Sequence, residues 1–352
     1  MRIVLSNSSS RWGGVHKVTE ILARGFQSRG HDVTVFGYPG KMLEDRMRGV
    51  APFQPILKGM DFNPVVLARA ALAIRRFRPD AVLTLMKKDV TLTGVVAAAS
   101  GIPVVVRHAN QRPLADNLYW KKLMGDLPSL HVTNAEATKK TLLDSAPFLQ
   151  AEAIKVIYNG IDPAPYDNSA RADIGLFEGE LALGFIGSFE ARKGLRELCT
   201  AWREVSRAIP KAHLILVGKG SMEAEMRTIL GDAHRVHWMG YRTDITAILK
   251  SLDVLVLPSY VEGAPNVVLE AMCAGTAVVA TAVSGTPELV RDGIEALLIP
   301  SRNTEALTGA LIEMLSDGQL RQRVTAAARE RVEEKFGLDR MIDDYEVTLS
   351  EL

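Results

Sequence analysis

The stretch DVLVLPSYVEGAPNVVLEAMCAGTAVVAT, residues 253–281, decides the fold. It opens with an apolar run and closes with another at 277–281, and both are typical of strands buried on two faces. Between the runs, Pro265 suits the first position of a helix, and Gly275 can end that helix in a left-handed conformation. The stretch therefore predicts a strand–helix–strand unit of a parallel, doubly wound α/β sheet.

Similar short β-branched runs alternate with helical patterns over the whole chain. The expected strands are 2–6, 32–37, 81–85, 103–108, 130–134 and 154–160 in the first half, and 181–187, 213–218, 236–240, 253–258, 277–281 and 296–300 in the second. The stretch NGIDPAPYDNSARAD at 159–173 is rich in turn-forming residues and separates the two sets. We therefore expect two Rossmann-like domains, 1–160 and 161–335, whose ligands bind beyond the carboxyl ends of the strands.

The two halves differ in charge. Residues 1–160 hold 22 Lys and Arg against 12 Asp and Glu, a net charge of +10, whereas the remaining residues hold 20 against 29, a net charge of −9. The basic half is expected to attract an anionic surface or ligand. No base-reading or aromatic-rich motif accompanies this charge, which disfavours nucleic acid.

Compartment signals are few in this sequence. Cys199 and Cys273 are the two cysteines, and both are expected to be core residues, because two isolated thiols supply neither a metal site nor a disulfide framework. No apolar run reaches the length of a membrane span, and the chain opens directly on a strand pattern. A cytoplasmic location is expected.

Glu262 and Glu270 carry the chemistry of the deciding stretch. Ala264, expected at the helix cap, has no side-chain oxygen, so the first-turn N–H groups are available to an external anion such as a phosphate. A carboxylate beside a phosphate is repelled unless it binds hydroxyl groups instead. One acid on each side of a diphosphate site predicts a nucleotide sugar, with a sugar at one acid and a ribose at the other.

Two other interpretations of these acids were open. Glu270 could be an ordinary solvated residue on a helix face. The two acids could also be a glycosidase pair, but the intervening residues place them roughly 9–12 Å apart at a helical rise of about 1.5 Å per residue. That separation is too long for the ~5–5.5 Å of a retaining glycosidase.

The stretch PSYVEGAPNVVLEAMCAGTAVVAT resembles the E-x7-E region of the retaining glycosyltransferases of family 4, which have the GT-B fold. Further similar segments are WGGVHK, VIYNGID, GFIGSFEARKG, LILVGKGS, MGYRTDITAILKSLDVLVLPS and SGTPELVRDGIEALLIP. The resemblance implies two Rossmann-like domains facing across a cleft, with acceptor binding at 1–160 and donor binding at 161–335. It also implies that 336–352 is a helix crossing back to the N-terminal domain.

The family's site roles transfer to matching residues here. The resemblance implies that Glu270 binds the donor ribose, that Glu262 contacts the donor sugar and that Lys193 binds phosphate. Lys193, Glu262 and His108, at the end of the strand PVVVRH, are the expected catalytic residues. The remaining expected donor-binding residues are Gly13, Gly14, Gly187, Ser188, Arg192, Gly218, Gly263, Ala264, Pro265, Asn266 and Val267. Ser188 replaces the family's usual arginine, and Arg192 is the candidate substitute.

No Asp-x-Asp motif for a divalent metal occurs in the sequence. The resemblance therefore implies a retaining, metal-independent transferase without a cofactor, in which the helix dipole and Lys193 stabilise the leaving diphosphate. The expected donor is a UDP-linked hexose or N-acetylhexosamine. The expected acceptor is lipid-linked or part of a surface polysaccharide or lipopolysaccharide, with the protein peripheral on the inner membrane. A nucleotide-sugar epimerase of the same fold and a non-catalytic binding module are the alternatives.

Overall fold

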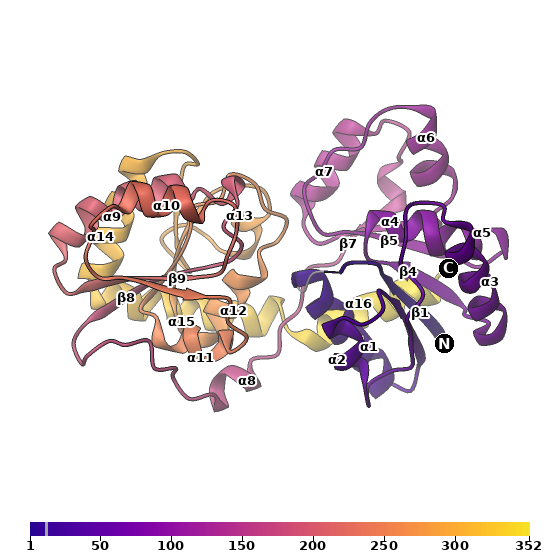
Figure 1. Ribbon diagram of the computed structural model, residues 1–352, viewed down its shortest axis with the longest axis horizontal. Helices are drawn as coiled ribbons and strands as arrows, with labels where there is room; N and C mark the ends of the chain where they lie inside the picture. Colours follow the sequence, from indigo (N-terminus) through magenta and orange to yellow (C-terminus); the bar gives the residue numbers. More distant parts are fainter. Residues whose placement is uncertain (11–12) are drawn as a thin grey trace. The chain divides into compact units, whose positions relative to one another are not determined.

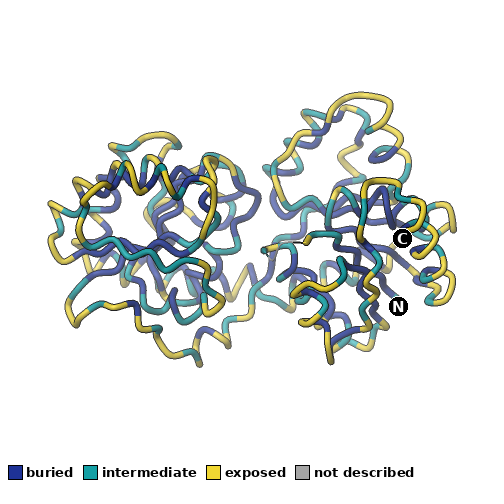
Figure 2. Tube along the Cα trace, viewed as in Figure 1, coloured by how far each residue is buried: buried dark blue, intermediate teal, exposed yellow. Residues whose placement is uncertain are grey.

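The computed structural model describes residues 1–10 and 13–352, which form two compact units. Unit 1 comprises Met1–Gly160 together with Leu338–Leu352, and unit 2 comprises Ile161–Gly337. In each unit the strands form a buried centre beneath more exposed helices and loops (Figure 2). Both units are doubly wound α/β structures, so the predicted fold class is confirmed.

Unit 1 contains a seven-stranded parallel sheet in the order β3-β2-β1-β4-β5-β6-β7. Its strands are β1 (Arg2–Asn7), β2 (Asp32–Gly37), β3 (Phe53–Gln54), β4 (Ala81–Thr84), β5 (Val104–His108), β6 (Leu130–Thr133) and β7 (Ile154–Val156). Its helical segments are α1 (Gly14–Ser28), α2 (Met42–Met47), α3 (Pro64–Phe77), α4 (Lys87–Asp89), η1 (Val90–Gly94), α5 (Val95–Ala99), α6 (Leu118–Trp120), η2 (Lys121–Asp126), α7 (Glu136–Ser145), η3 (Ala151–Ala153) and α16 (Leu338–Ser350).

The two faces of this sheet bury alternate residues of each strand. Ile3 and Leu5 of β1 pack in one core with α1, α2 and α16, whereas Val4 faces a second core with α3, α5 and α7. Figure 1 shows the first set of helices on one side of the sheet and α3 and α5 on the other. Because the central strands are covered on both faces, their sequences are almost continuously apolar.

Unit 2 contains a six-stranded parallel sheet in the order β10-β9-β8-β11-β12-β13. Its strands are β8 (Leu181–Ile186), β9 (Ala212–Val217), β10 (Val236–Gly240), β11 (Val254–Leu257), β12 (Ala277–Thr281) and β13 (Leu297–Ile299). Its helical segments are α8 (Ala164–Asn168), η4 (Ala191–Lys193), α9 (Leu195–Ala208), α10 (Glu223–Leu230), α11 (Ile245–Ser251), α12 (Asn266–Ala274), α13 (Thr286–Leu289), α14 (Thr304–Ser316) and α15 (Gly318–Lys335). Helices α9, α10 and α14 cover one face, and α11, α12 and α15 cover the other (Figure 1).

Two of the strand predictions need correction. The edge strand β3 was not predicted, because two residues are too short to show a periodic pattern. The run predicted as a strand over 154–160 pairs as β7 only to Val156. Beyond it the backbone turns to α16, where Gly160 N–H contacts the Met341 sulfur and the Tyr158 carbonyl accepts from Arg340.

Both cysteines are buried and free, as predicted. Within the described residues, no helix combines the length and apolar character needed to cross a bilayer.

Candidate functional site

In each sheet the chain adds its first strands on one side and its later strands on the other. The switch lies between β1 and β4 in unit 1 and between β8 and β11 in unit 2. Loops that leave the carboxyl ends of these neighbouring strands diverge and leave room for a ligand. In unit 2 the loops after β8 and β11 carry most of the predicted donor-binding residues.

Glu262 lies at the centre of a buried polar cluster after β11. Its Oε1 lies 2.5 Å from the Lys193 ammonium and accepts the Ser259 hydroxyl at 2.6 Å. Its backbone N–H donates to the Ser284 hydroxyl at 3.1 Å. Arg192 is more distant, at 3.7 Å from Oε2, and it also pairs with Glu190. The carboxylate is therefore fixed by one partly buried cation and one hydroxyl, with Arg192 at its solvent side.

Ser259 and Ser284 were not predicted from the sequence as members of this cluster. Ser259 is completely buried directly after the strand-ending Pro258, a position that could have marked it. Ser284 has a left-handed backbone, with φ at 53°, which is uncommon outside glycine. It belongs to the segment SGTPE, whose turn-forming composition is the only sequence feature that could have marked this residue.

Close backbone packing fixes the loop that carries Lys193. Gly194 has a φ of 66°, and a Cβ atom there would lie 1.9 Å from the Pro258 carbonyl oxygen. Tyr260 N–H also donates to the Arg192 carbonyl at 2.7 Å. Only glycine allows this approach, so Gly194 brings the loop after β8 against the loop after β11.

Gly218 performs a similar function at the end of β9, where it approaches Gly187 at the end of β8. A Cβ atom on Gly218 would lie 1.9 Å from the Gly187 carbonyl oxygen. Ser188, which follows directly, is half-buried, and its carbonyl accepts from Glu190 N–H at 3.0 Å. Ser188 therefore supplies no long side chain to this edge of the sheet.

Helix α12 begins one residue later than predicted. Pro265 is the cap, with an extended ψ of 109°, and Asn266 is the first helical residue, so the prediction of Ala264 as the cap is wrong. The reason is that the proline ring fixes φ but leaves ψ free to stay extended. No side chain caps this helix, whereas Gly275 ends it with a φ of 73°, as predicted.

The first turn of α12 presents backbone donors to its surroundings. Val268 N–H donates to the Pro265 carbonyl at 3.0 Å, and the Gly263 carbonyl accepts from Gly285 N–H at 3.0 Å. Within the described part of the chain, Val267 N–H makes no backbone hydrogen bond. An anion at this helix start would meet both an N–H donor and the positive end of the helix dipole.

Glu270 is the fifth residue of α12, one turn into the helix, and it is 8% exposed. Burial excludes its interpretation as a solvated surface residue. Burial also raises the pKa of the Tyr166 phenol, and Glu270 contributes to that rise. The carboxylate of Glu270 and the hydroxyl of Tyr166 on α8 are therefore close enough to interact electrostatically.

In unit 1, the predicted glycines lie after β1. Gly13 caps α1 with an extended backbone, and Gly14 is its first residue. Open space surrounds the position of a Cβ on Gly13. His16, two residues on, is buried in α1, with its Nε2 3.1 Å from the Ser9 carbonyl oxygen. Trp12, which opens the motif WGGVHK, lies outside the described residues.

His108 ends β5 and pairs with His131 of β6. The Nε2 of His108 lies 2.9 Å from His131 Nδ1, and His131 Nε2 lies 2.8 Å from the Met124 carbonyl oxygen. Burial holds the pKa of His108 well below its usual range, with further lowering by His131, Lys87 and Arg107. Burial lowers the pKa of His131 to about 4. Both rings are therefore neutral near pH 7.

This geometry assigns the protons of the pair. A carbonyl only accepts, so His131 carries its proton on Nε2 and its Nδ1 is an acceptor. His108 consequently donates from Nε2, and its neutral Nδ1 is left as an acceptor for a hydroxyl proton. His131 is buried and orients His108.

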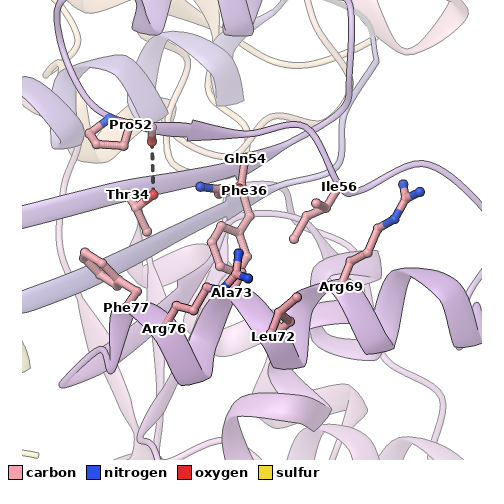
Figure 3. A pocket seen from close by; sticks show the side chains of 10 residues that line it. All are labelled: Thr34, Phe36, Pro52, Gln54, Ile56, Arg69, Leu72, Ala73, Arg76 and Phe77. Atoms are coloured by element: carbon pink, nitrogen blue, oxygen red, sulfur yellow. Dashed lines mark hydrogen bonds between the residues drawn. The ribbon is translucent and has the colours of Figure 1, made fainter.

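A groove of about 440 Å³ lies on a different part of unit 1, along β2, β3 and α3 (Figure 3). Its apolar walls include Phe36, Ile56 and Leu72, and Arg69 and Arg76 project from α3 beside them. It includes none of the predicted donor-binding residues. Among the described residues, no group of three or more His, Cys, Asp or Glu side chains is arranged to hold a metal ion.

Comparison with known proteins defines the class. The family models for glycosyl transferases group 1 and for glycosyltransferase family 4 match residues 180–317 and 12–165. The solved structure of Anabaena Alr3699/HepE in complex with UDP-glucose superposes with a TM-score of 0.85 at 20% identity, over 100% of both chains. The two doubly wound units are thus those of the GT-B fold, and the chain belongs to the family 4 glycosyltransferases.

Two curated relatives illustrate the range of this family. The lipopolysaccharide core biosynthesis glycosyltransferase LpsE of Rhizobium meliloti is 31% identical over 46% of this chain and 47% of its own. The UDP-Gal:α-D-GlcNAc-diphosphoundecaprenol α-1,3-galactosyltransferase of Escherichia coli is 23% identical over 77% and 75%. The chain spans about half the length of the first curated relatives it matches.

Proposed function

We propose that the protein is a retaining, metal-independent glycosyltransferase that moves a hexose or N-acetylhexosamine from a UDP-sugar to a lipid-linked or surface-glycan acceptor. The observation that carries the proposal is the buried cluster of Glu262, Lys193 and Ser259 beside the uncapped start of α12. Removing an acid and a cation from water costs desolvation energy, which is recovered only where the pair has good geometry and further hydrogen bonds. The anion-binding helix start beside them fits a donor diphosphate.

The donor roles follow from this arrangement. The N–H groups at the start of α12 and the Lys193 ammonium bind the diphosphate and stabilise the charge that develops on the leaving group. Glu262 is oriented by Lys193 to accept from hydroxyls of the transferred sugar, and the buried Glu270 accepts from those of the ribose. The Anabaena relative, solved with UDP-glucose, and the E. coli relative, named for UDP-Gal, support uridine as the base.

On unit 1, His108 supplies a ring nitrogen that can accept a hydrogen bond. Its Nδ1 is suited to accept a hydrogen bond from a donor-sugar hydroxyl, which would orient the sugar for attack. Because none of the described residues places a nucleophilic side chain in an evident position at the site, catalysis rests on positioning and on electrostatic stabilisation of the diphosphate. The acceptor's proton then passes to the donor phosphate in a front-face attack.

A screen of nucleotide sugars by thermal shift, without metal and with a chelator present, tests the donor assignment. We expect stabilisation by one UDP-sugar, a loss of that stabilisation in Glu270→Gln, and no loss in Glu305→Gln, an exposed acid on α14. Failure of every UDP-sugar to stabilise the protein would refute the donor assignment. Conversion of the sugar without an acceptor would instead identify an epimerase.

The surface of α3 supports a peripheral membrane location. Val65 and Leu72 are 58% and 51% exposed, and Arg69 and Arg76 border the groove with no acid among its lining residues. Cationic side chains beside exposed apolar ones favour docking on an anionic bilayer.

Flotation with anionic vesicles at low salt tests this docking. The double variant Arg69→Gln, Arg76→Gln should lose binding, whereas Arg171→Gln, Arg323→Gln, with the same charge change on unit 2, should retain it. Equal binding by all three proteins would exclude α3 as the docking surface.

A further inference from the structure

Two cations follow neighbouring strand ends at the carboxyl edge of the unit 1 sheet, and one of them, Lys87, interacts electrostatically with His108. Strands β4 and β5 are parallel neighbours, with Thr84 opposite Val106, so the loops that follow them leave the sheet on the same side. Lys87 comes three residues after β4, and Arg112 comes four residues after His108. Both residues therefore follow neighbouring strand ends at the same edge of the sheet.

An aromatic pair fixes Lys87 in place. The Lys87 ammonium lies 3.5 Å from the centroid of the Trp120 ring, and Trp120 packs edge-to-face with Tyr119 at 4.7 Å between centroids. A cation over an aromatic face is attracted by the ring quadrupole. Burial and then Arg112 lower the pKa of Lys87, so the two cations lie within electrostatic range of each other.

The loop that carries Arg112 is anchored to its neighbours. Gln111 donates to the Ala137 carbonyl at 3.2 Å, and Asn134 donates to the Ala109 carbonyl at 3.4 Å. Arg112 itself is exposed. Arg112 is therefore an exposed residue on an anchored segment.

Neighbouring acids do not neutralise these cations. Asp89, two residues from Lys87, is fully buried and accepts the N–H groups of Ser8 and Met86, each at 2.9 Å. Asp61 interacts electrostatically with Tyr119, and Asp116 is exposed. Within the described residues, neither Lys87 nor Arg112 forms an ion pair. Two positioned cations with no counter-ion are a site for an external anion.

We propose that Lys87 and Arg112 bind a phosphate group of the acceptor, and that the acceptor is a glycosyl phosphate or diphosphate. This inference rests on the proposed transferase function and specifies its acceptor. The phosphate could belong to a soluble sugar phosphate or to a lipid-linked one, since both present the same anion to the two cations. Binding of this phosphate by the two cations then positions the acceptor sugar next to His108.

Fluorine NMR of protein labelled with 5-fluorotryptophan tests the site directly. The sequence has four tryptophans, so the resonance of Trp120 can be assigned by its disappearance in Trp120→Phe. The probes are hexose 1-phosphate, the same hexose without phosphate, and a short-chain prenyl diphosphohexose, all at constant ionic strength. We expect the two phosphorylated probes to shift the Trp120 resonance and the plain hexose to leave it unchanged.

Variants identify the cations. Lys87→Met and Arg112→Gln should each weaken binding about 10- to 100-fold, the usual cost of losing a hydrogen bond to a charged group. Lys122→Gln, an exposed lysine of the neighbouring segment paired with Asp126 at 2.9 Å, should bind like the wild type. Tighter binding of the prenyl probe assigns a lipid-linked acceptor, and equal binding assigns a soluble one.

The inference is overturned if potassium chloride alone produces the same shift, or if Lys87→Met and Arg112→Gln bind both phosphorylated probes as the wild type does. Thermal shift with UDP-sugars on the same samples separates the two proposals. Donor binding without phosphate binding would refute the acceptor site alone, whereas no donor binding would refute the transferase function.

Discussion

At the residue scale, His108 has one ring nitrogen bonded to His131 and the other available as an acceptor. The buried His131 controls this state, because its own proton is held by the Met124 carbonyl. Two neutral imidazoles in series can orient a hydroxyl, but they do not act as a cationic site. The pair therefore predicts a distinctive dependence on pH.

We expect kcat/KM for sugar transfer to show no histidine titration near pH 6.5, because the pKa of His108 lies well below that value. The neutral ring, and with it the acceptor nitrogen, persists as the pH falls through the normal histidine range. His131→Phe removes the partner that orients His108 and should lower kcat/KM about three- to tenfold. His131→Gln, which can both donate to Met124 and accept from His108, is the control. A normal histidine inflection near pH 6.5 in the wild type would contradict this assignment.

Asp89 should make stability depend on pH in the opposite sense to a typical carboxylate. Burial raises its pKa from 3.8 to about 7, so between these values the folded protein keeps a proton that the unfolded chain has lost. The free energy of unfolding should therefore fall as pH rises from about 4 to about 7, by at most ~1.4 kcal/mol per pH unit. Denaturant unfolding of the wild type minus that of Asp89→Asn isolates this slope. A difference that is flat over this range would exclude a raised pKa.

At the element scale, backbone contacts between loops determine where the site lies. The Lys193 loop and the loop after β11 meet because Gly194 leaves room for the Pro258 carbonyl. Gly275 has a similar left-handed backbone at the end of α12, but its surroundings are open. Substitutions at the two glycines therefore distinguish the free-energy cost of a left-handed backbone from that of a steric clash.

Gly275→Ala should lower the free energy of unfolding by about 1–2 kcal/mol, the conformational cost of a left-handed alanine. Gly194→Ala should cost at least twice as much, because its Cβ would lie 1.9 Å from a backbone oxygen. Gly194→Ala should also weaken UDP-sugar binding, since Lys193 moves with its loop. Equal losses of stability in denaturant unfolding would show that the loops separate without cost.

Local patterns predicted most of the elements around these loops. The apolar runs gave twelve of the strands, and Gly275 correctly marked the end of α12. Contacts between distant residues had no local signal: Lys193 and Glu262 are 69 positions apart, and the ion pair between them follows from the order of the strands. The role of His131 was missed for the same reason, because its partner His108 comes from another strand.

At the scale of the whole molecule, unit 1 is built from two distant parts of the chain. Helix α16 completes its core with Met341, Ile342, Tyr345 and Leu349, all 2% exposed or less. The Tyr345 hydroxyl accepts from Arg107 Nε at 3.1 Å, and His31 Nε2 lies 2.9 Å from a Glu346 carboxylate oxygen. The last helix is therefore a structural part of unit 1.

Leu349→Ala should lower the free energy of unfolding by about 2–5 kcal/mol, as expected for a cavity in a packed core. Val347, which is 54% exposed on the same helix, provides the matched control. Val347→Ala should change stability by no more than about 0.5 kcal/mol. Calorimetry with and without a UDP-sugar would identify the unfolding transition that the sugar does not stabilise. It would then show whether Leu349→Ala destabilises that transition. Similar values for both variants would mean that α16 does not support the core.

The divided construction of unit 1 also sets the order of events during biosynthesis. The first 160 residues leave the ribosome without the helix that covers one face of their sheet, and that helix follows only after all of unit 2. At ordinary rates of translation this interval is roughly 10–40 s. Throughout it, the apolar surface that α16 later covers is open to water and to chaperones, while unit 2 can already fold as a continuous segment.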